Sequence, residues 1–257
     1  MTMKTTATHP FDRALKRHFY SVGVGPGAPD LLTCRAARLI ETADVIIAPR
    51  STVAETSLAL DTVRHLIAPP QEVLDHQYAM KRSEAVTVAN WTPMADQVVD
   101  RCRNGKSVVH ITLGAPMIYS TTAYLLPLVL EHLDADHVHV VPGISAFQIA
   151  GALFSDPLTI QEDRLMLMPA TDLAAVEQAL GHCETLVLYK CAKVLAPLAL
   201  LLEKHGLARA ARMICYAEQG ERQAVYHNLS DAIGTRHGYM ATIIIHIGRK
   251  SWHNASE

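Results

Sequence analysis

The sequence contains few aromatic residues and no long apolar segment. Aromatic side chains account for 5% of the 257 residues and hydrophobic residues for 49%, so the core must consist mainly of Leu, Val, Ile and Ala. This composition favours helices packed on sheets over a sandwich built on aromatic pairs. No apolar run reaches the roughly 20 residues that span a bilayer, and the first residues lack the apolar segment of a signal peptide. We therefore expect a cytoplasmic protein without a membrane partner.

The sequence also lacks an excess of positive charge and any close pair of cysteines. The net charge is −2 and no long basic run occurs, which gives no support to a nucleic-acid partner. The five cysteines are scattered without a Cys-x-x-Cys pair, as in proteins with reduced thiols. His137 and His139 are two residues apart, as on one face of a strand, but zinc requires three or four converging ligands. We predict no metal site.

Short apolar segments alternate with segments of helical periodicity along the chain, which predicts an α/β fold. Strands are expected at 19–24, 45–48, 107–113, 137–141, 165–169, 185–189, 213–217, 223–227 and 241–248. Helices are expected at 30–42, 90–104, 121–133, 145–153, 172–180 and 194–205. The Pro-Gly pair at 142–143 indicates a hinge. We therefore predict two α/β domains, 19–141 and 142–250, between a flexible tail at 1–18 and a tail at 251–257.

Three loops rich in glycine and proline follow expected strands. They are Gly-Val-Gly-Pro-Gly at 23–27, Leu-Gly-Ala-Pro-Met-Ile-Tyr-Ser-Thr at 113–121, and Val-Pro-Gly-Ile-Ser-Ala at 141–146. In open α/β sheets, ligands bind at the carboxyl ends of the strands, where such loops leave backbone N–H groups accessible. Each loop alone also fits an ordinary turn, and Ser120 or Thr121 fits a helix cap.

Together, in this order and spacing, the three loops resemble the tetrapyrrole methylase family along essentially the whole chain. That family includes uroporphyrinogen and precorrin methyltransferases, diphthine synthase and a ribosomal RNA methyltransferase. The resemblance implies two α/β domains with S-adenosylmethionine in a cleft between them, a tetrapyrrole substrate and a homodimer. It places the cofactor against Leu113, Gly114, Ala115, Ile118, Ser120, Thr121, Ser145, Ala146, Tyr189, Lys190, Ala241 and Thr242.

Four further segments resemble the branch of the family that methylates carbon 20 of precorrin-2 or cobalt-factor II on the way to cobalamin. They are Pro-Arg-Ser at 49–51, Tyr-Ala-Met-Lys at 78–81, Met-Pro-Ala-Thr at 168–171 and Leu-Tyr-Lys at 188–190. The implied substrate-binding residues are Gly25, Pro26, Gly27, Arg50, Ser51, Tyr78 and Met80. Arg50 suits the ring carboxylates because it follows a strand directly. For Lys81 and Arg82, binding of the carboxylates and an ordinary solvated charge are both open.

Carbon 20 must lose its hydrogen after methyl transfer, so the reaction needs a base. Tyr119 is the catalytic candidate, with His110 and Glu218 as alternatives. The family usually reads Gly-Asp-Pro where this chain has Ala115. Two other functions stay open: methylation of a different acceptor, and a relative that binds cofactor or tetrapyrrole without turnover, which the missing acid alone favours. Whether the ring is metal-free or carries cobalt is also open.

Overall fold

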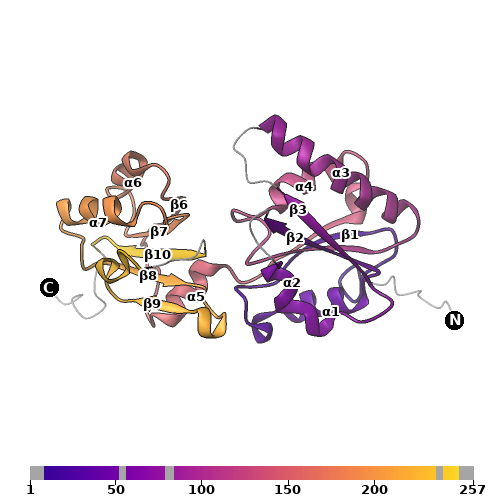
Figure 1. Ribbon diagram of the computed structural model, residues 1–257, viewed down its shortest axis with the longest axis horizontal. Helices are drawn as coiled ribbons and strands as arrows, with labels where there is room; N and C mark the ends of the chain where they lie inside the picture. Colours follow the sequence, from indigo (N-terminus) through magenta and orange to yellow (C-terminus); the bar gives the residue numbers. More distant parts are fainter. Residues whose placement is uncertain (1–8, 52–55, 79–83, 236–239, 249–257) are drawn as a thin grey trace. The chain divides into compact units, whose positions relative to one another are not determined.

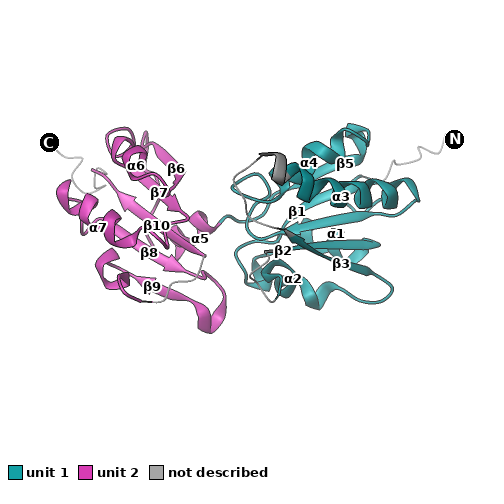
Figure 2. Ribbon diagram, turned by 45° about the horizontal axis from the view of Figure 1, so that its top comes forward, with its two compact units in different colours: residues 1–145 teal, residues 146–257 magenta. Residues whose placement is uncertain are grey.

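A computed structural model describes residues 9–51, 56–78, 84–235 and 240–248. The chain divides into two compact units, residues 1–145 and 146–257 (Figure 2). Each unit contains one five-stranded sheet, in the orders β3-β2-β4-β1-β5 and β6-β7-β10-β8-β9. The α/β fold class predicted from the sequence is confirmed.

Unit 1 is a parallel sheet with helices on both faces. Its elements are β1 (Phe19–Gly23), α1 (Cys34–Thr42), β2 (Val45–Ser51), α2 (Leu58–Val63), β3 (Glu72–Tyr78), α3 (Glu84–Arg103), β4 (Val108–Thr112), α4 (Thr122–Leu130) and β5 (Val138–Val141). All its neighbouring strands are parallel, so their carboxyl ends meet at one edge. Helices α1 and α2 cover one face, and α3 and α4 cover the other (Figure 1).

The two faces of this sheet bury separate apolar clusters. Val22, Ile46 and Ile111 pack with α1 on one side. Phe19, Ile47 and Val108 pack on the other side with Trp91 and with Leu125 of α4. Burial on both faces explains why β1 and β4 have every residue buried, as expected of strands inside a parallel sheet.

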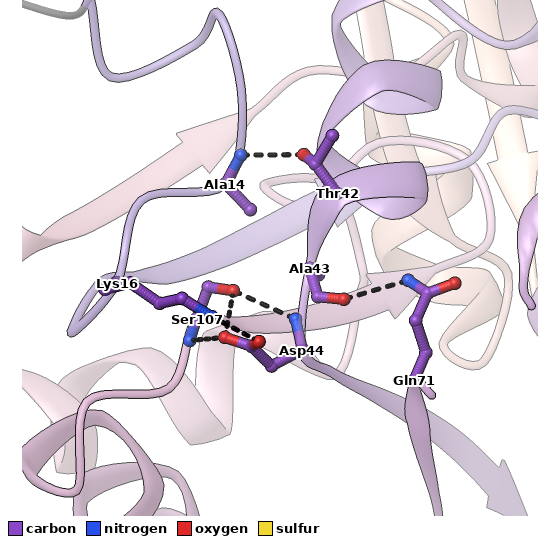
Figure 3. A network of polar contacts seen from close by, with 7 residues as sticks. All are labelled: Ala14, Lys16, Thr42, Ala43, Asp44, Gln71 and Ser107. Carbon is purple, nitrogen blue, oxygen red and sulfur yellow. Dashed lines mark hydrogen bonds and ion pairs between the residues drawn. The ribbon is translucent and has the colours of Figure 1, made fainter. Parts of the chain in front are cut away.

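The amino ends of β2 and β4 are held together by polar contacts around Asp44 (Figure 3). The Asp44 carboxylate accepts hydrogen bonds from the backbone N–H of Ser107 at 2.7 Å and from its hydroxyl at 2.8 Å. Lys16 adds an ion pair. Partial burial alone would raise the pKa of Asp44, but the hydrogen bonds from Lys16 and Ser107 outweigh it and hold the pKa below its usual value.

Unit 2 is a mixed sheet. Its elements are α5 (Ala146–Leu153), β6 (Leu165–Pro169), α6 (Leu173–Ala179), β7 (Thr185–Tyr189), α7 (Leu195–Lys204), β8 (Ala211–Cys215), β9 (Ala224–Tyr226) and β10 (Ala241–His246). Strand β10 lies antiparallel between β7 and β8. The carboxyl ends of β7 and β8 therefore share one edge with the amino end of β10.

Several sequence expectations need correction. The helix expected at 90–104 begins at Glu84, and the strand expected at 213–217 lies at Ala211–Cys215. The strand expected at 45–48 does not end at Pro49 but continues to Ser51; β2 pairs with β4 only over Val45–Ile47, so the proline lies where one side of the strand is unpaired. The helix expected from Asp30 begins at Cys34, because the Thr33 hydroxyl caps it by accepting the N–H of Ala36. Strand β3 and helix α2 were not expected.

Among the helices that the structure describes, none combines the length and the hydrophobicity that a membrane span requires.

Candidate functional site

The three glycine-proline loops of the sequence lie side by side in unit 1, beyond the carboxyl ends of β1, β4 and β5. Gly25 and Gly114 form an isolated antiparallel bridge. The N–H of Gly114 donates to the carbonyl of Gly25 at 2.6 Å, and the reverse bond measures 3.3 Å. Because these contacts join backbones directly, the loop after β1 and the loop after β4 form one unit.

Glycine is required where these loops touch. A Cβ atom on Gly143 would lie 2.3 Å from the carbonyl oxygen of Gly114 and 2.8 Å from the carbonyl carbon of Gly23. A Cβ atom on Gly23 would lie 2.6 Å from the same oxygen of Gly114. No other residue fits such distances without moving backbone. The sequence motifs therefore mark a real three-way contact at the carboxyl edge of the sheet.

The loop at 113–121 leads into helix α4 through a short polar turn. The Ser120 hydroxyl donates to the carbonyl of Pro116 at 2.5 Å and accepts the N–H of Thr122 at 3.0 Å. Ser120 is therefore the capping residue, and Thr121 makes no side-chain cap bond. Tyr119 has a left-handed φ of 48°. Tyr119 is 52% exposed and Met117 is 66% exposed, so this loop presents apolar groups and a phenol at the surface.

His110, one of the candidate bases, is not placed to meet a substrate. Its side chain is fully buried inside β4. Burial, with a smaller contribution from His76, lowers the pKa of His110 to about 3. The imidazole is therefore neutral at physiological pH and has no exposed atom with which to contact a ligand.

In unit 2, Tyr189, Lys190, Ala241 and Thr242 lie together at one edge of the sheet. Thr242 pairs in register with Tyr189. The Tyr189 hydroxyl accepts the N–H of Phe147 at 3.2 Å, which brings Ala146 to the same place. Lys190 directly follows β7 with a left-handed φ of 55°. Ser145, next along the chain from Ala146, belongs to unit 1 and is 3% exposed.

The same edge holds a segment that the sequence did not single out as a binding element. Tyr216 and Glu218 follow β8 with left-handed φ values of 49° and 59°. The N–H of Tyr216 bonds Met240, next to Ala241, and the N–H of Glu218 bonds the side chain of Gln223. Residues held in this region of φ gather at functional sites. The sequence indicated Glu218 only as a base and gave no reason to consider Tyr216, because no pattern signals a positive φ at tyrosine.

The residues expected to bind substrate fall into three groups. Gly25, Pro26 and Gly27 lie in the first loop, the first two of them buried. Arg50 forms an ion pair with Asp75 of the neighbouring strand, with 2.7 Å between Nη2 and Oδ2. Ser51 and Tyr78 end β2 and β3 in register. Met80, Lys81 and Arg82 lie outside the described residues.

No set of three His, Cys, Asp or Glu side chains that could hold a metal ion occurs within the described ranges. His139 instead contacts His18, with 2.8 Å between its Nε2 and Nδ1 of His18. The rings are stacked with centroids 5.1 Å apart, and His137 lies edge-on to His18 at 4.6 Å.

Comparison with known sequences identifies relatives along almost the whole chain. Residues 18–232 match the family described as Tetrapyrrole (Corrin/Porphyrin) Methylases. The cobalt-precorrin-2 C(20)-methyltransferase of Salmonella typhimurium is 32% identical over 239 residues, which cover 92% of this chain and 98% of the relative. A probable cobalt-precorrin-2 C(20)-methyltransferase of Methanocaldococcus jannaschii is 26% identical over 177 residues, covering 68% of this chain and 73% of that protein.

Solved structures share the fold at lower identity. A cobalt precorrin-4 methyltransferase superposes with a TM-score of 0.68 at 22% identity, covering 90% of this chain and 95% of that one. The uroporphyrin-III C-methyl transferase of Thermus thermophilus, complexed with S-adenyl homocysteine, gives 0.63 at 21% identity, covering 89% and 92%. With the three-loop contact, the two α/β units and the sequence match, the chain belongs to the tetrapyrrole methylase family.

Proposed function

We propose that this protein transfers a methyl group from S-adenosylmethionine to carbon 20 of precorrin-2 or of its cobalt-loaded form, in cobalamin biosynthesis. The observation that carries the proposal is the 32% identity to a cobalt-precorrin-2 C(20)-methyltransferase over 98% of that enzyme's length. The second relative, at 26% identity, is named as a probable enzyme of the same reaction.

The chemistry demands positioning more than acid or base strength. The sulfonium of the donor is already positively charged, and the charge disperses as the methyl group moves to the ring carbon. The protein must therefore hold sulfur, methyl and carbon in line and exclude water. Loops of small residues with accessible backbone groups suit this task, and the backbones at Gly23, Gly114 and Gly143 pack closely together.

The cofactor is assigned to the loops at the strand ends of both units. In unit 1 these are Leu113, Gly114, Ala115, Ile118, Ser120, Thr121 and Ser145. In unit 2 they are Ala146, Tyr189, Lys190, Ala241 and Thr242. Support comes from the Thermus thermophilus relative of the same fold, whose structure contains S-adenyl homocysteine. Gly25, Pro26, Gly27, Arg50, Ser51, Tyr78 and Met80 are assigned to the tetrapyrrole.

Tyr119 is the proposed base for the carbon-20 proton. Its exposed phenol lies in the same loop as the cofactor residues, whereas His110 is fully buried. Tyr119→Phe removes only the hydroxyl and should lower kcat about 100-fold or more, within the usual range for general acid–base groups, with little change in KM for S-adenosylmethionine. Tyr124→Phe, at a tyrosine that is 51% exposed on α4, is the matched control. Equal activity of the two variants would remove Tyr119 from the mechanism.

A homodimer and a cytoplasmic location belong to the same proposal. The apolar residues Leu125, Leu126, Leu128 and Val129 of α4 give little support to a dimer interface, because Leu125 and Val129 are fully buried in the core of unit 1. Tyr124 and Leu130 remain exposed on α4, at 51% and 45%. A concentration-independent monomer mass in sedimentation would contradict the dimer.

The decisive experiment incubates the purified protein with methyl-labelled S-adenosylmethionine and either precorrin-2 or its cobalt-loaded form. Transfer of the label to carbon 20, located by NMR of the product, is the expected result. The ratio of kcat/KM for the two rings identifies the substrate. Transfer to another carbon would contradict the proposed position. Tight binding of both ligands without transfer would indicate a non-catalytic relative. Ala115, in place of the family's acid, would then be the first residue to consider as the cause.

A further inference from the structure

A chain of three buried polar side chains crosses unit 1 from β4 through β1 to the start of α4. The Ser21 hydroxyl lies 2.7 Å from the hydroxyl of Thr122 and 3.4 Å from Nδ1 of His110. Ser21 and His110 are fully buried and Thr122 is 1% exposed. The neighbouring positions Phe19, Val108 and Leu125 belong to one hydrophobic cluster, so most of the surroundings are apolar.

Polar groups in such a place are costly unless they bond one another. Burial lowers the pKa of His110 to about 3, so the imidazole is neutral and the buried side chains carry no charge. Nε2 of His110 has no hydrogen-bond partner among the residues that the structure describes. In the tautomer with the proton on Nδ1, the only unsatisfied group of the imidazole is the lone pair of Nε2. The Nδ1–H group can then donate to the Ser21 hydroxyl. Ser21 can then donate to Thr122.

Thr122 is the first residue of α4, directly after the loop at 113–121. The residue at the usual capping position, Thr121, makes no side-chain bond to the helix. The start of α4 is instead held by two contacts at Thr122: its N–H bonds the Ser120 hydroxyl at 3.0 Å and its side chain bonds Ser21. Both contacts are directional, whereas the apolar packing around them is not.

We propose that Ser21, His110 and Thr122 form a buried polar anchor that positions the loop at 113–121 for the cofactor. This inference rests on the proposed function, in which that loop binds S-adenosylmethionine. Ser21 and Thr122 are positioning residues, because they are buried and act through the backbone of the loop. His110 supports them by orienting the Ser21 hydroxyl.

The test replaces the Thr122 hydroxyl with a methyl group of the same shape. Thr122→Val removes the bond to Ser21, and Thr122→Ser keeps it. Thr185→Val is the matched control: Thr185 is a fully buried threonine of unit 2 that contacts Nδ1 of His246 at 3.0 Å. For each variant we would measure the melting temperature, the Kd of S-adenosylhomocysteine by calorimetry, and kcat and KM for S-adenosylmethionine.

The anchor predicts a specific pattern across these variants. Thr122→Val should weaken the cofactor Kd and raise KM by about tenfold, the size expected for one buried hydrogen bond, with kcat at saturation within about twofold. Thr122→Ser should restore wild-type Kd. Thr185→Val should lower the melting temperature without changing Kd. Ser21→Ala repeats the test from the other side if Thr122→Val does not fold.

The outcomes separate this inference from the proposed function. Absence of S-adenosylhomocysteine binding by the unmodified protein would overturn both. Binding by the unmodified protein, with Thr122→Val and Thr185→Val equal in Kd, would overturn the anchor alone and make the contact purely structural. Failure of Thr122→Ser to restore binding would also overturn it, because the hydroxyl would then not be the cause.

Discussion

Gly143 lies where the backbones after β1, β4 and β5 come closest. A methyl group there would stand 2.3 Å from the carbonyl oxygen of Gly114, so Gly143→Ala must push two loops apart. We expect a loss of about 1–3 kcal/mol in unfolding free energy, as for other overpacked sites, together with weaker binding of S-adenosylhomocysteine. Gly181→Ala is the control, because its nearest neighbour is 3.8 Å away. Chemical denaturation of both variants checks the prediction, and equal stability would contradict it.

Ala115 stands where the family usually has an acid, and its effect can be measured directly. The side chain is half-buried in the loop before α4. If the pocket has adapted to alanine, Ala115→Asp places a carboxylate without a partner there, which costs stability and hinders the ligand. We expect kcat/KM to fall in Ala115→Asp, with a lower melting temperature. A clear gain in kcat would show instead that the site lacks a catalytic acid.

At the residue level, the sequence predicted the backbone motifs better than the roles of side chains. Glycines at 23, 114 and 143 indicate tight turns, because few other residues fit where backbone bends sharply or approaches closely. The structure brings these three glycines together. Burial of His110 could not be read from the sequence. It depends on α3 and α4 covering that face of the sheet, which is a tertiary effect.

At the element level, the regular strands of the two cores were predictable from apolar runs, and 165–169 and 185–189 match their expected bounds. Strand β3 was not predictable. Its residues Asp75, His76 and Gln77 are polar because it lies at the edge of the sheet, so the apolar signal of a buried strand is missing. Edge strands depend on a neighbour that local sequence does not reveal.

The amino ends of β1 and β5 are joined by the contact between His18 and His139, which makes this part of unit 1 sensitive to acid. Burial, together with His18 and His137, lowers the pKa of His139 to about 4, despite an opposing contribution from Asp136. Burial and His137 also lower the pKa of His18. As the pH falls below 6.5, the unfolded chain binds protons that the folded chain does not, so the stabilisation present above pH 6.5 is lost towards pH 4.

His139→Gln should therefore make the free energy of unfolding depend less on pH. Between pH 6.5 and pH 4, the loss of unfolding free energy should be smaller than in the unmodified protein by about 2 kcal/mol. His132→Gln, at an exposed histidine, should leave the slope unchanged. Urea unfolding at several pH values measures both. Parallel curves for the two variants would show that His139 does not carry the pH dependence.

For the whole molecule, S-adenosylhomocysteine should raise the melting temperature because it binds only the folded protein. At a concentration of about 100 times Kd, mass action contributes roughly 2.7 kcal/mol. For a protein of this size that corresponds to a rise of about 5–10 °C. Adenosine, which lacks the homocysteine chain, is the control ligand and should give a smaller shift at the same concentration. The proposed cofactor positions occur in both units, with Gly114 in one and Thr242 in the other. Gly143→Ala, which displaces the loop of Gly114, and a bulky replacement of Ala241 should therefore each reduce the shift. A shift that is unchanged by one of these substitutions would contradict cofactor binding by that unit, and no shift in the unmodified protein at saturation would count against S-adenosylmethionine as the donor.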